Sequence, residues 1–363
     1  MSHRFDALPS GCYSVDMFGF PLTTSAGIVA LVSASICWAF TRRAFHEIKL
    51  PMGSWGIVSA VTAAGLTAGL TFAMLQAGCQ DTPDVIPQPF WRDARVIYQS
   101  LLIVLLVAAT ATDLESFYIT DSVTVPGMIL GLLGATVAGD LQIIHVWIDW
   151  NQEIPQLAGP YRPEWMAVHP HLHGFAWSAA GLVAGGGLTW GVRKISSGLL
   201  GQETMGLGDV WLMGMVGSFL GWQPTVIAFM IAPLCALSVG LLARLLGNKN
   251  YVPYGPYLSL ASIIVMFTWR WIWMLEFGLS KGAAANDRVS TFALRRLFGD
   301  WLSLAAIGTI TVFGLVILLG LSRLYQLIPV KRSDHSKSSD PLVETTPSDQ
   351  TTPSDQTTPQ EDE

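Results

Sequence analysis

Nine long apolar segments constrain what this chain can fold into more than any other feature of its sequence. Crossing a bilayer takes about 20 predominantly apolar residues in a helix. Only 13% of the residues are charged and 51% are hydrophobic, whereas a soluble domain carries about 25% charged residues. The sequence therefore predicts an all-α, polytopic membrane helix bundle with about nine transmembrane helices, at 25–41, 54–78, 96–112, 122–139, 174–192, 208–221, 223–246, 256–275 and 301–323.

The segment 208–221 is shorter than the others. It is predicted to cross the membrane with help from the loop before it, or to form a tight hairpin with 223–246.

Basic residues in the connecting segments predict the orientation of the bundle, because cytoplasmic loops carry an excess of lysine and arginine. The basic residues Arg288, Arg295 and Arg296 fall on the opposite side and weaken this rule. We expect a multi-pass protein of the inner (plasma) membrane with its N-terminus outside and its C-terminus in the cytoplasm. The residues that support this orientation follow the first, fifth, seventh and ninth spans: Arg42, Arg43, Lys49, Arg193, Lys194, Arg244, Lys249, Arg323, Lys331 and Arg332.

The predicted spans divide as two in residues 1–94, six in 95–275 and one in 276–332, and residues 333–363 form a polar tail. The tail repeats the hexapeptide TTPSDQ, which has no apolar residue to bury, so we expect it to be disordered. Stretches rich in glycine and alanine predict close packing of helices in lipid.

The cysteines and the net charge exclude some classes of partner. Cys12, Cys37, Cys79 and Cys235 form no CxxC pair, which argues against a zinc ribbon. Cys37 and Cys235 are expected to be packing residues, whereas Cys12 and Cys79 could form a disulfide on one side of the membrane. The net charge of −6 gives no reason to expect a nucleic-acid partner.

No cleavable signal peptide is expected, because no strongly basic segment precedes the first apolar run.

Two aspartates are predicted to lie at the same face of the membrane. Asp113 ends the third span and Asp209 begins the sixth, so the topology places both at the cytoplasmic boundary. Two close carboxyl groups that share a proton can activate water and donate to a peptide carbonyl, and they titrate as a unit. Each could instead be a helix cap or a solvated loop residue. Glu115, Asp121 and Glu203 share this face, and spacing alone does not choose among the five acids.

Three blocks of the sequence resemble those of the prepilin peptidases, the type IV leader peptidase family of membrane aspartic proteases. In that family an aspartate is followed eight residues later by a second one, a Met-Gly-x-Gly-Asp step opens an apolar helix, and a Pro-Phe-Gly-Pro-Tyr-like turn opens the last core helix. The resemblance covers about residues 95–275 and implies that the six spans in this range form the aspartic peptidase core. Its blocks in this chain are TDLESFYITDSVTVPG at 112–127, MGLGDVWLMGMVGSFLGW at 205–222 and VPYGPYLSLA at 252–261.

The resemblance implies that Asp113 and Asp209 are the catalytic pair. The glycines of the second block leave room for a tight turn and for the approach of a peptide backbone. Supporting residues are expected at the other matching positions: Asp121, Gly206, Gly208, Pro253, Gly255 and Pro256.

The resemblance also implies an aspartic-type endopeptidase that acts among membrane lipids without a metal or organic cofactor. Its substrates would be prepilin or pseudopilin-like membrane proteins, cut after the glycine of a short basic leader at the cytoplasmic face. The N-terminal region lacks the cysteine-bearing domain of bifunctional members, so no N-methyltransferase activity is expected. The chain departs from the family at Thr120, where proline is usual, at Trp211, where lysine is common, and in a longer loop at 140–173.

Other functions remain open at this stage. A presenilin-like or signal-peptide-peptidase-like intramembrane protease also uses a Gly-x-Gly-Asp step, but its Tyr-Asp and Pro-Ala-Leu motifs are absent. A non-catalytic membrane scaffold or a small transporter with acidic gating residues is a third possibility.

His169, His171 and His173 alternate in the long external loop. In an extended segment they could bind zinc or copper, or they could belong to a polar loop at the membrane interface.

Overall fold

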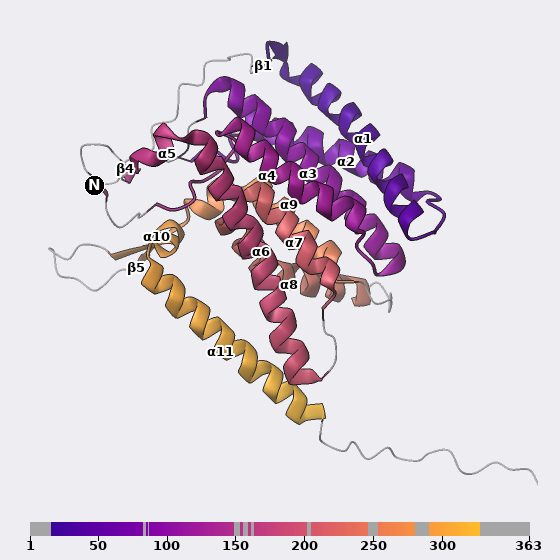
Figure 1. The fold of residues 1–363 in the computed structure, drawn as a ribbon, viewed down its shortest axis with the longest axis vertical. Helices are drawn as coiled ribbons and strands as arrows, with labels where there is room; N and C mark the ends of the chain where they lie inside the picture. The colour runs from indigo at the N-terminus through magenta and orange to yellow at the C-terminus, as the bar shows by residue number, and fades with distance from the viewer. Residues whose placement is uncertain are drawn as a thin grey trace, which may run out of the picture.

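The computed structural model describes residues 16–82, 85, 87–148, 153–154, 159–160, 163–201, 205–245, 253–279 and 290–326. Most of the regular structure in these residues is helical, which confirms the predicted all-α bundle (Figure 1). The predicted disordered tail lies outside the described residues. The long helices are α1 Leu22–Glu47, α2 Trp55–Leu75, α3 Pro89–Ser116, α4 Asp121–Ala138, α6 Pro170–Leu200, α7 Leu207–Leu220, α8 Trp222–Leu245, α9 Gly255–Trp273 and α11 Trp301–Gln326.

Short elements connect these helices. They include the helices α5 Glu164–Val168 and α10 Leu294–Gly299. In the described residues the strands pair as antiparallel hairpins: β1 Asp16–Met17 with β2 Phe20–Pro21, β3 Glu153–Ile154 with β4 Gly159–Pro160, and β5 Glu276–Leu279 with β6 Ser290–Ala293.

Each predicted span coincides with a long helix. Among the described residues, α1, α2, α3, α4 and the part of α8 at Trp222–Leu242 are long and apolar enough to cross a membrane, and α7 is apolar but shorter. The helix α7 ends at Leu220 and α8 begins at Trp222, so a single residue joins the two helices, which also contact each other. Gly221 between them has a φ of +82°, a left-handed conformation that favours glycine.

The helices α3 and α7 form the centre of the bundle. The helix α3 contacts α1, α2, α4, α7 and α9. Its residues from 102 to 109 are all buried, as are those of α7 from 212 to 220. Over these residues the neighbouring helices cover α3 and α7 on all sides. The two aspartates of the sequence prediction are therefore carried by the best-packed helices of the protein.

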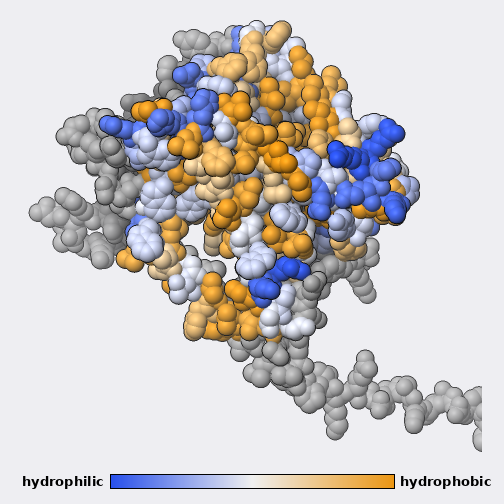
Figure 2. All heavy atoms as spheres, viewed as in Figure 1, coloured by the Kyte–Doolittle hydropathy of each residue, from blue (hydrophilic) through white to orange (hydrophobic). Residues whose placement is uncertain are grey.

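Apolar side chains also cover much of the outside of the bundle. Figure 2 shows them across the middle of one face, with hydrophilic residues gathered towards its left and right edges. Large exposed side chains include Leu31, Ile57, Val137, Val183 and Leu237. An exposed apolar surface of this extent is expected where the solvent is lipid.

Glycines allow α6 and α7 to approach each other closely. A Cβ atom built on Gly181 would collide with the carbonyl oxygen of Gly217, and one built on Gly217 with that of Gly181. Gly185 likewise lies against the carbonyl oxygen of Met213. Small residues at such contacts stabilise helix pairs in lipid through van der Waals packing.

We therefore expect Gly217→Val to destabilise the protein strongly, because the new side chain would force α7 away from α6. Overpacking a well-packed contact costs about 2–3 kcal/mol. The measurement is the thermal unfolding midpoint in detergent micelles. Gly187→Val is the matched control, since it adds the same side chain to a helical glycine with open space around it. Equal shifts in the two variants would contradict the packing argument.

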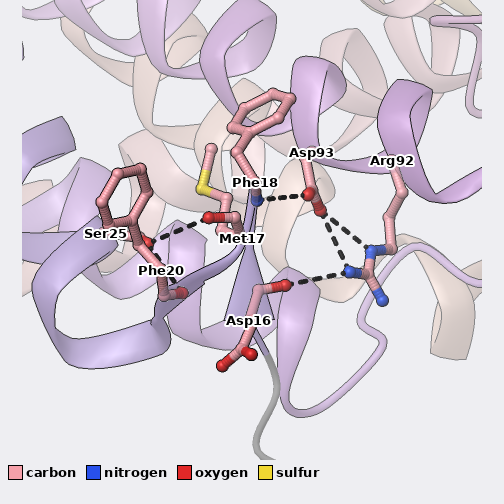
Figure 3. Close-up of polar contacts among 7 residues, drawn as sticks. All are labelled: Asp16, Met17, Phe18, Phe20, Ser25, Arg92 and Asp93. Atoms are coloured by element: carbon pink, nitrogen blue, oxygen red, sulfur yellow. Dashed lines mark hydrogen bonds and ion pairs between the residues drawn. The ribbon is translucent and has the colours of Figure 1, made fainter.

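The N-terminal hairpin is tied to the start of α3 (Figure 3). The amide of Phe18 donates to Asp93 Oδ2 over 2.8 Å, and Arg92 Nη2 donates to the carbonyl oxygen of Asp16 over 3.4 Å. Arg92 also pairs with Asp93 at 3.0 Å. These contacts lie at the end of α3 opposite to Asp113, so they hold the first strands away from the two aspartates.

The alternative of a Cys12–Cys79 disulfide is wrong for this structure. Cys79 is a free, buried thiol whose Sγ atom lies 3.8 Å from the carbonyl oxygen of Met266. Burial, and then the carboxylate of Asp81, raise the pKa of the Cys79 thiol to about 12. The side chain therefore stays protonated and acts as a packing residue. Cys12 lies outside the described residues.

Candidate active site

Asp113 lies in the last turns of α3, where the chain leaves the centre of the bundle. Its side chain is buried, and its Oδ2 atom accepts no hydrogen bond within the described part of the chain. The helix ends at Ser116, and the next residue, Phe117, has a φ of +56°. This left-handed turn is uncommon for a bulky residue. It directs the chain sharply towards α4 and leaves the Asp113 carboxyl group at the end of the helix.

Asp209 lies in the first turn of α7 and is also buried. The preceding glycine, Gly206, is the N-cap residue, and its backbone amide lies beside the Asp209 carboxyl group. The N-terminus of a helix carries unpaired amides and a partial positive charge, which stabilise a carboxylate there. The block around Gly206 thus places an acid at the N-terminus of a buried helix.

The two carboxyl groups open into the same cavity of about 240 Å³. It is built from the end of α3, the start of α7 and the turn before α9, and the two acids are near enough for their charges to interact. We call the end of the bundle that holds this cavity the site end. The cavity lining comprises Asp113, Phe117, Tyr118, Ile119, Met205, Gly206, Leu207, Gly208, Asp209, Pro253 and Tyr254.

Glycine is required beside Asp113 for space rather than for backbone conformation. A Cβ atom built on Gly255 would collide with Asp113 Oδ2 and would lie 2.9 Å from Ile119. One built on Gly208 would lie 2.9 Å from the Cβ atom of Ile119. Gly206 is less restricted, since the nearest atom, Asp209 Oδ2, would be 3.6 Å away. The glycines therefore allow α7 and α9 to approach the end of α3.

Two prolines lie where α9 approaches the end of α3. Pro253 is buried in the cavity wall, and Pro256 occupies one of the first positions of α9. Proline is favoured there because its fixed φ suits the first helical turn. The role of Pro253 and Pro256 in shaping the site stays a prediction.

Tyr254 is a cavity residue that the sequence reasoning did not single out. Burial, and then the carboxylate of Asp209, raise the pKa of the Tyr254 phenol to about 12. The hydroxyl group is therefore a neutral hydrogen-bond donor throughout the range in which the acids titrate. Its only sequence signal is its position directly before Gly255.

Asp121 and Glu115 do not reach the cavity. Asp121 is the first residue of α4 and is exposed, and its charge raises the pKa of the neighbouring Tyr118. Glu115 is exposed as well and accepts a 2.8 Å hydrogen bond from Trp55 Nε1. Glu203 lies outside the described residues. Of the rival acids, the structure thus brings together the two that the three sequence blocks indicated.

The two residues that depart from the family pattern, Thr120 and Trp211, also lie outside the cavity. Thr120 is the buried N-cap residue of α4. Trp211 is 42% exposed and lines a separate apolar groove between α4, α6 and α7. Trp211 therefore adds apolar surface to the side of the bundle and does not line the cavity that holds the two acids.

The histidines do not form the extended segment that the sequence suggested. His171 and His173 lie in the first turns of α6, where residues two apart point in nearly opposite directions. His171 Nδ1 lies 3.0 Å from the carbonyl oxygen of Thr136, whereas His173 is buried 5.2 Å from the ring of His145. Within the described residues there is no group of three or more potential ligands that could hold a metal ion.

Together these features define a multi-pass membrane helix bundle with two buried acids at one end. Residues 165–241 match the type IV leader peptidase family. The prepilin leader peptidase/N-methyltransferase of Aeromonas hydrophila is 28% identical over 174 residues, which is 46% of this chain and 47% of that protein. The protein of the same name from Aeromonas salmonicida (strain A449) is 30% identical over 169 residues, which is 46% of this chain and 47% of that protein.

A protein of that name from Pseudomonas putida is 22% identical over 258 residues, with 69% of this chain and 77% of that protein covered. No solved structure gives a significant match. The chain spans about half the length of the first curated relatives it matches. These comparisons confirm the resemblance to the prepilin peptidase family that the three sequence blocks carry.

Proposed function

We propose that this protein is a membrane aspartic endopeptidase that removes the leader of prepilin or pseudopilin-like proteins. The observation that carries the proposal is the shared cavity, in which Asp113 from α3 and Asp209 from α7 are both buried. Burial of two acids together is costly in a membrane protein and marks a functional site. The family relationship supplies the class of reaction and of substrate.

In the proposed mechanism one of the two carboxyl groups is ionised and the other is protonated. The ionised group takes a proton from a water molecule as its oxygen attacks the scissile carbonyl carbon, and the protonated group donates to the carbonyl oxygen. The tetrahedral intermediate then breaks its C–N bond: the leaving nitrogen takes a proton from the first carboxyl group, and the second carboxylate takes a proton back from a hydroxyl group of the intermediate. The products are a new carboxyl terminus on the leader and a new amino terminus on the mature protein.

The glycines at the site end support a peptide as the substrate. Gly206 lines the cavity without a side chain, and apart from its chain neighbours no atom lies closer than 3.6 Å to the position of its Cβ atom, so an extended backbone can approach the acids. The proposed substrate has a short basic leader followed by an apolar helix that stays in the membrane. By the orientation that the basic loops predict, cleavage would take place at the cytoplasmic face of the inner membrane.

Cleavage of a reporter prepilin tests the proposal. The reporter carries a basic leader ending in glycine and then an apolar helix, and it is mixed with membranes that contain this protein. We expect a product whose N-terminus is the residue after that glycine, identified by mass spectrometry. An intact reporter, together with uptake of a solute that depends on this protein, would favour the transporter alternative instead.

The same product also tests the prediction that this chain does not methylate. With S-adenosylmethionine added to the cleavage reaction, we expect the mass of the new N-terminal peptide to be that of the free amine. The Aeromonas hydrophila relative, a prepilin leader peptidase/N-methyltransferase, provides the positive control. A product heavier by one methyl group, seen only when this protein is present, would show that the prediction is wrong.

A further inference from the structure

An apolar groove runs along the bundle between α2, α3 and α9 and encloses about 300 Å³. Leu66 and Ile263 line one end, and Trp55, Leu114 and Pro256 line the other. We call it the α2–α3–α9 groove. From Trp55 to Leu66 along α2, a rise of 1.5 Å per residue gives a length of roughly 16 Å. A groove of that length takes the side chains from one face of about three turns of helix.

This groove ends at the candidate active site. Leu114 follows Asp113 in α3, and Pro256 follows Gly255 at the start of α9. The groove and the cavity thus lie on neighbouring faces of the same two helix ends. A helix bound in the groove would bring its own end to the mouth of the cavity that holds both acids.

One buried hydroxyl group favours a peptide over a lipid chain in this groove. Ser259 lines it, is 3% exposed, and its Oγ atom has no hydrogen-bond partner among the described residues. An unsatisfied hydroxyl group costs free energy in an apolar environment. An acyl chain offers it no partner, whereas any helix offers backbone carbonyl oxygens, each with a second lone pair that can accept a hydrogen bond.

Charge at the rim of the groove fits a positively charged segment. Trp55 Nε1 donates a 2.8 Å hydrogen bond to Glu115, which holds an exposed carboxylate where α2 begins and α3 ends. By contrast, the groove between α4, α6 and α7 reaches the start of α7 but is lined by no hydroxyl group. Of these two grooves near the acids, only the α2–α3–α9 groove combines apolar walls with a polar partner and a negative rim.

We propose that the α2–α3–α9 groove binds the apolar helix of the leader-bearing substrate, with the basic leader at Glu115. This inference rests on the proposed function, since it assigns a binding surface to that function's substrate. It also gives α2, which precedes the predicted six-helix core, a direct part in substrate recognition. The scissile bond would be positioned by binding energy from the non-reacting apolar helix.

Site-specific photo-crosslinking tests the groove independently of cleavage. The photoreactive residue p-benzoylphenylalanine replaces Thr62, which lines the α2–α3–α9 groove, or Val183, which lines the groove between α4, α6 and α7. Both positions are exposed. With the reporter prepilin in the same membranes, we expect a crosslinked product from position 62 and none from position 183. Crosslinks to lipid alone at position 62, or to the reporter only at position 183, would overturn the assignment.

Filling each groove gives the matching kinetic test. Thr62→Trp is expected to lower kcat/KM for the reporter about tenfold, because it removes binding energy from the remote helix. Val183→Trp adds the same bulk to the other groove and is expected to leave kcat/KM within about twofold. Normal cleavage by Thr62→Trp would reject the groove and leave the proposed peptidase in place. Failure of the unmodified protein to cleave any leader-bearing reporter would reject the peptidase itself.

Discussion

Replacing either Asp113 or Asp209 with asparagine is expected to abolish leader cleavage while the protein still folds. Each carboxyl group has a separate task, one as base and one as acid, so neither can replace the other. General acid–base groups contribute about 10²–10⁴-fold to the rate, and we expect a loss of about 10³-fold from each substitution. The measurement is the initial rate of reporter cleavage in membranes, with the unfolding midpoint in detergent as the check on folding.

Asp121→Asn is the informative comparison for this pair. Asp121 lies at the same end of the bundle and belongs to the first sequence block, but it is exposed and outside the cavity. We expect this variant to keep its rate within about tenfold of the unmodified protein, because a rim charge acts mainly on encounter. If Asp121→Asn lost as much activity as Asp113→Asn, or if one aspartate of the pair proved dispensable, the assignment of the two acids would fail.

The helices were predictable from sequence because each is a long apolar segment bounded by polar residues. The bilayer requires about 20 such residues for a crossing, and this requirement fixes the helices with little reference to tertiary contacts. The short helix α7 is understood only with its neighbours, since glycines at positions such as Gly217 bury it against α6. The direction in which the bundle crosses the membrane stays a prediction from the basic loops.

The histidine segment shows where this reasoning fails. Its alternating pattern suggested an extended loop, but the apolar residues that follow propagate α6 back to Pro170. His173 is then buried in the interior and His171 points to the neighbouring helix α4. A short local pattern is overridden when a long helix can be extended through it, because each added residue gains a hydrogen bond.

The candidate site was partly predictable. Sequence blocks and topology indicated Asp113 and Asp209, and the structure places both in one cavity. They could not indicate Tyr254, nor that Asp121 lies outside, because these facts depend on how α3, α7 and α9 pack against one another. The close approach of Gly255 to Asp113 is of the same kind: sequence gives a glycine in a turn, and only the fold shows which carboxyl group it meets.

The close approach of Gly255 to Asp113 predicts a large effect from replacing one hydrogen atom with a methyl group. Gly255→Ala adds a methyl group where it would collide with Asp113 Oδ2, so the carboxyl group must turn away from the cavity. A misplacement of about 1 Å in a catalytic group can lower the rate by about 10²-fold. We expect a loss of that size in kcat for reporter cleavage, with crosslinking of the reporter at position 62 retained.

Gly191→Ala separates this effect from the general consequences of adding a methyl group to a helix. Gly191 lies in α6 with no atom close to the position of the new Cβ, and alanine favours a helix interior over glycine by about 1 kcal/mol. Its kcat is expected to be unchanged and its unfolding midpoint equal or slightly higher. Because Gly255 has a negative φ, alanine there introduces no backbone strain. Full activity in Gly255→Ala would therefore mean that Asp113 does not act from the position seen in this cavity.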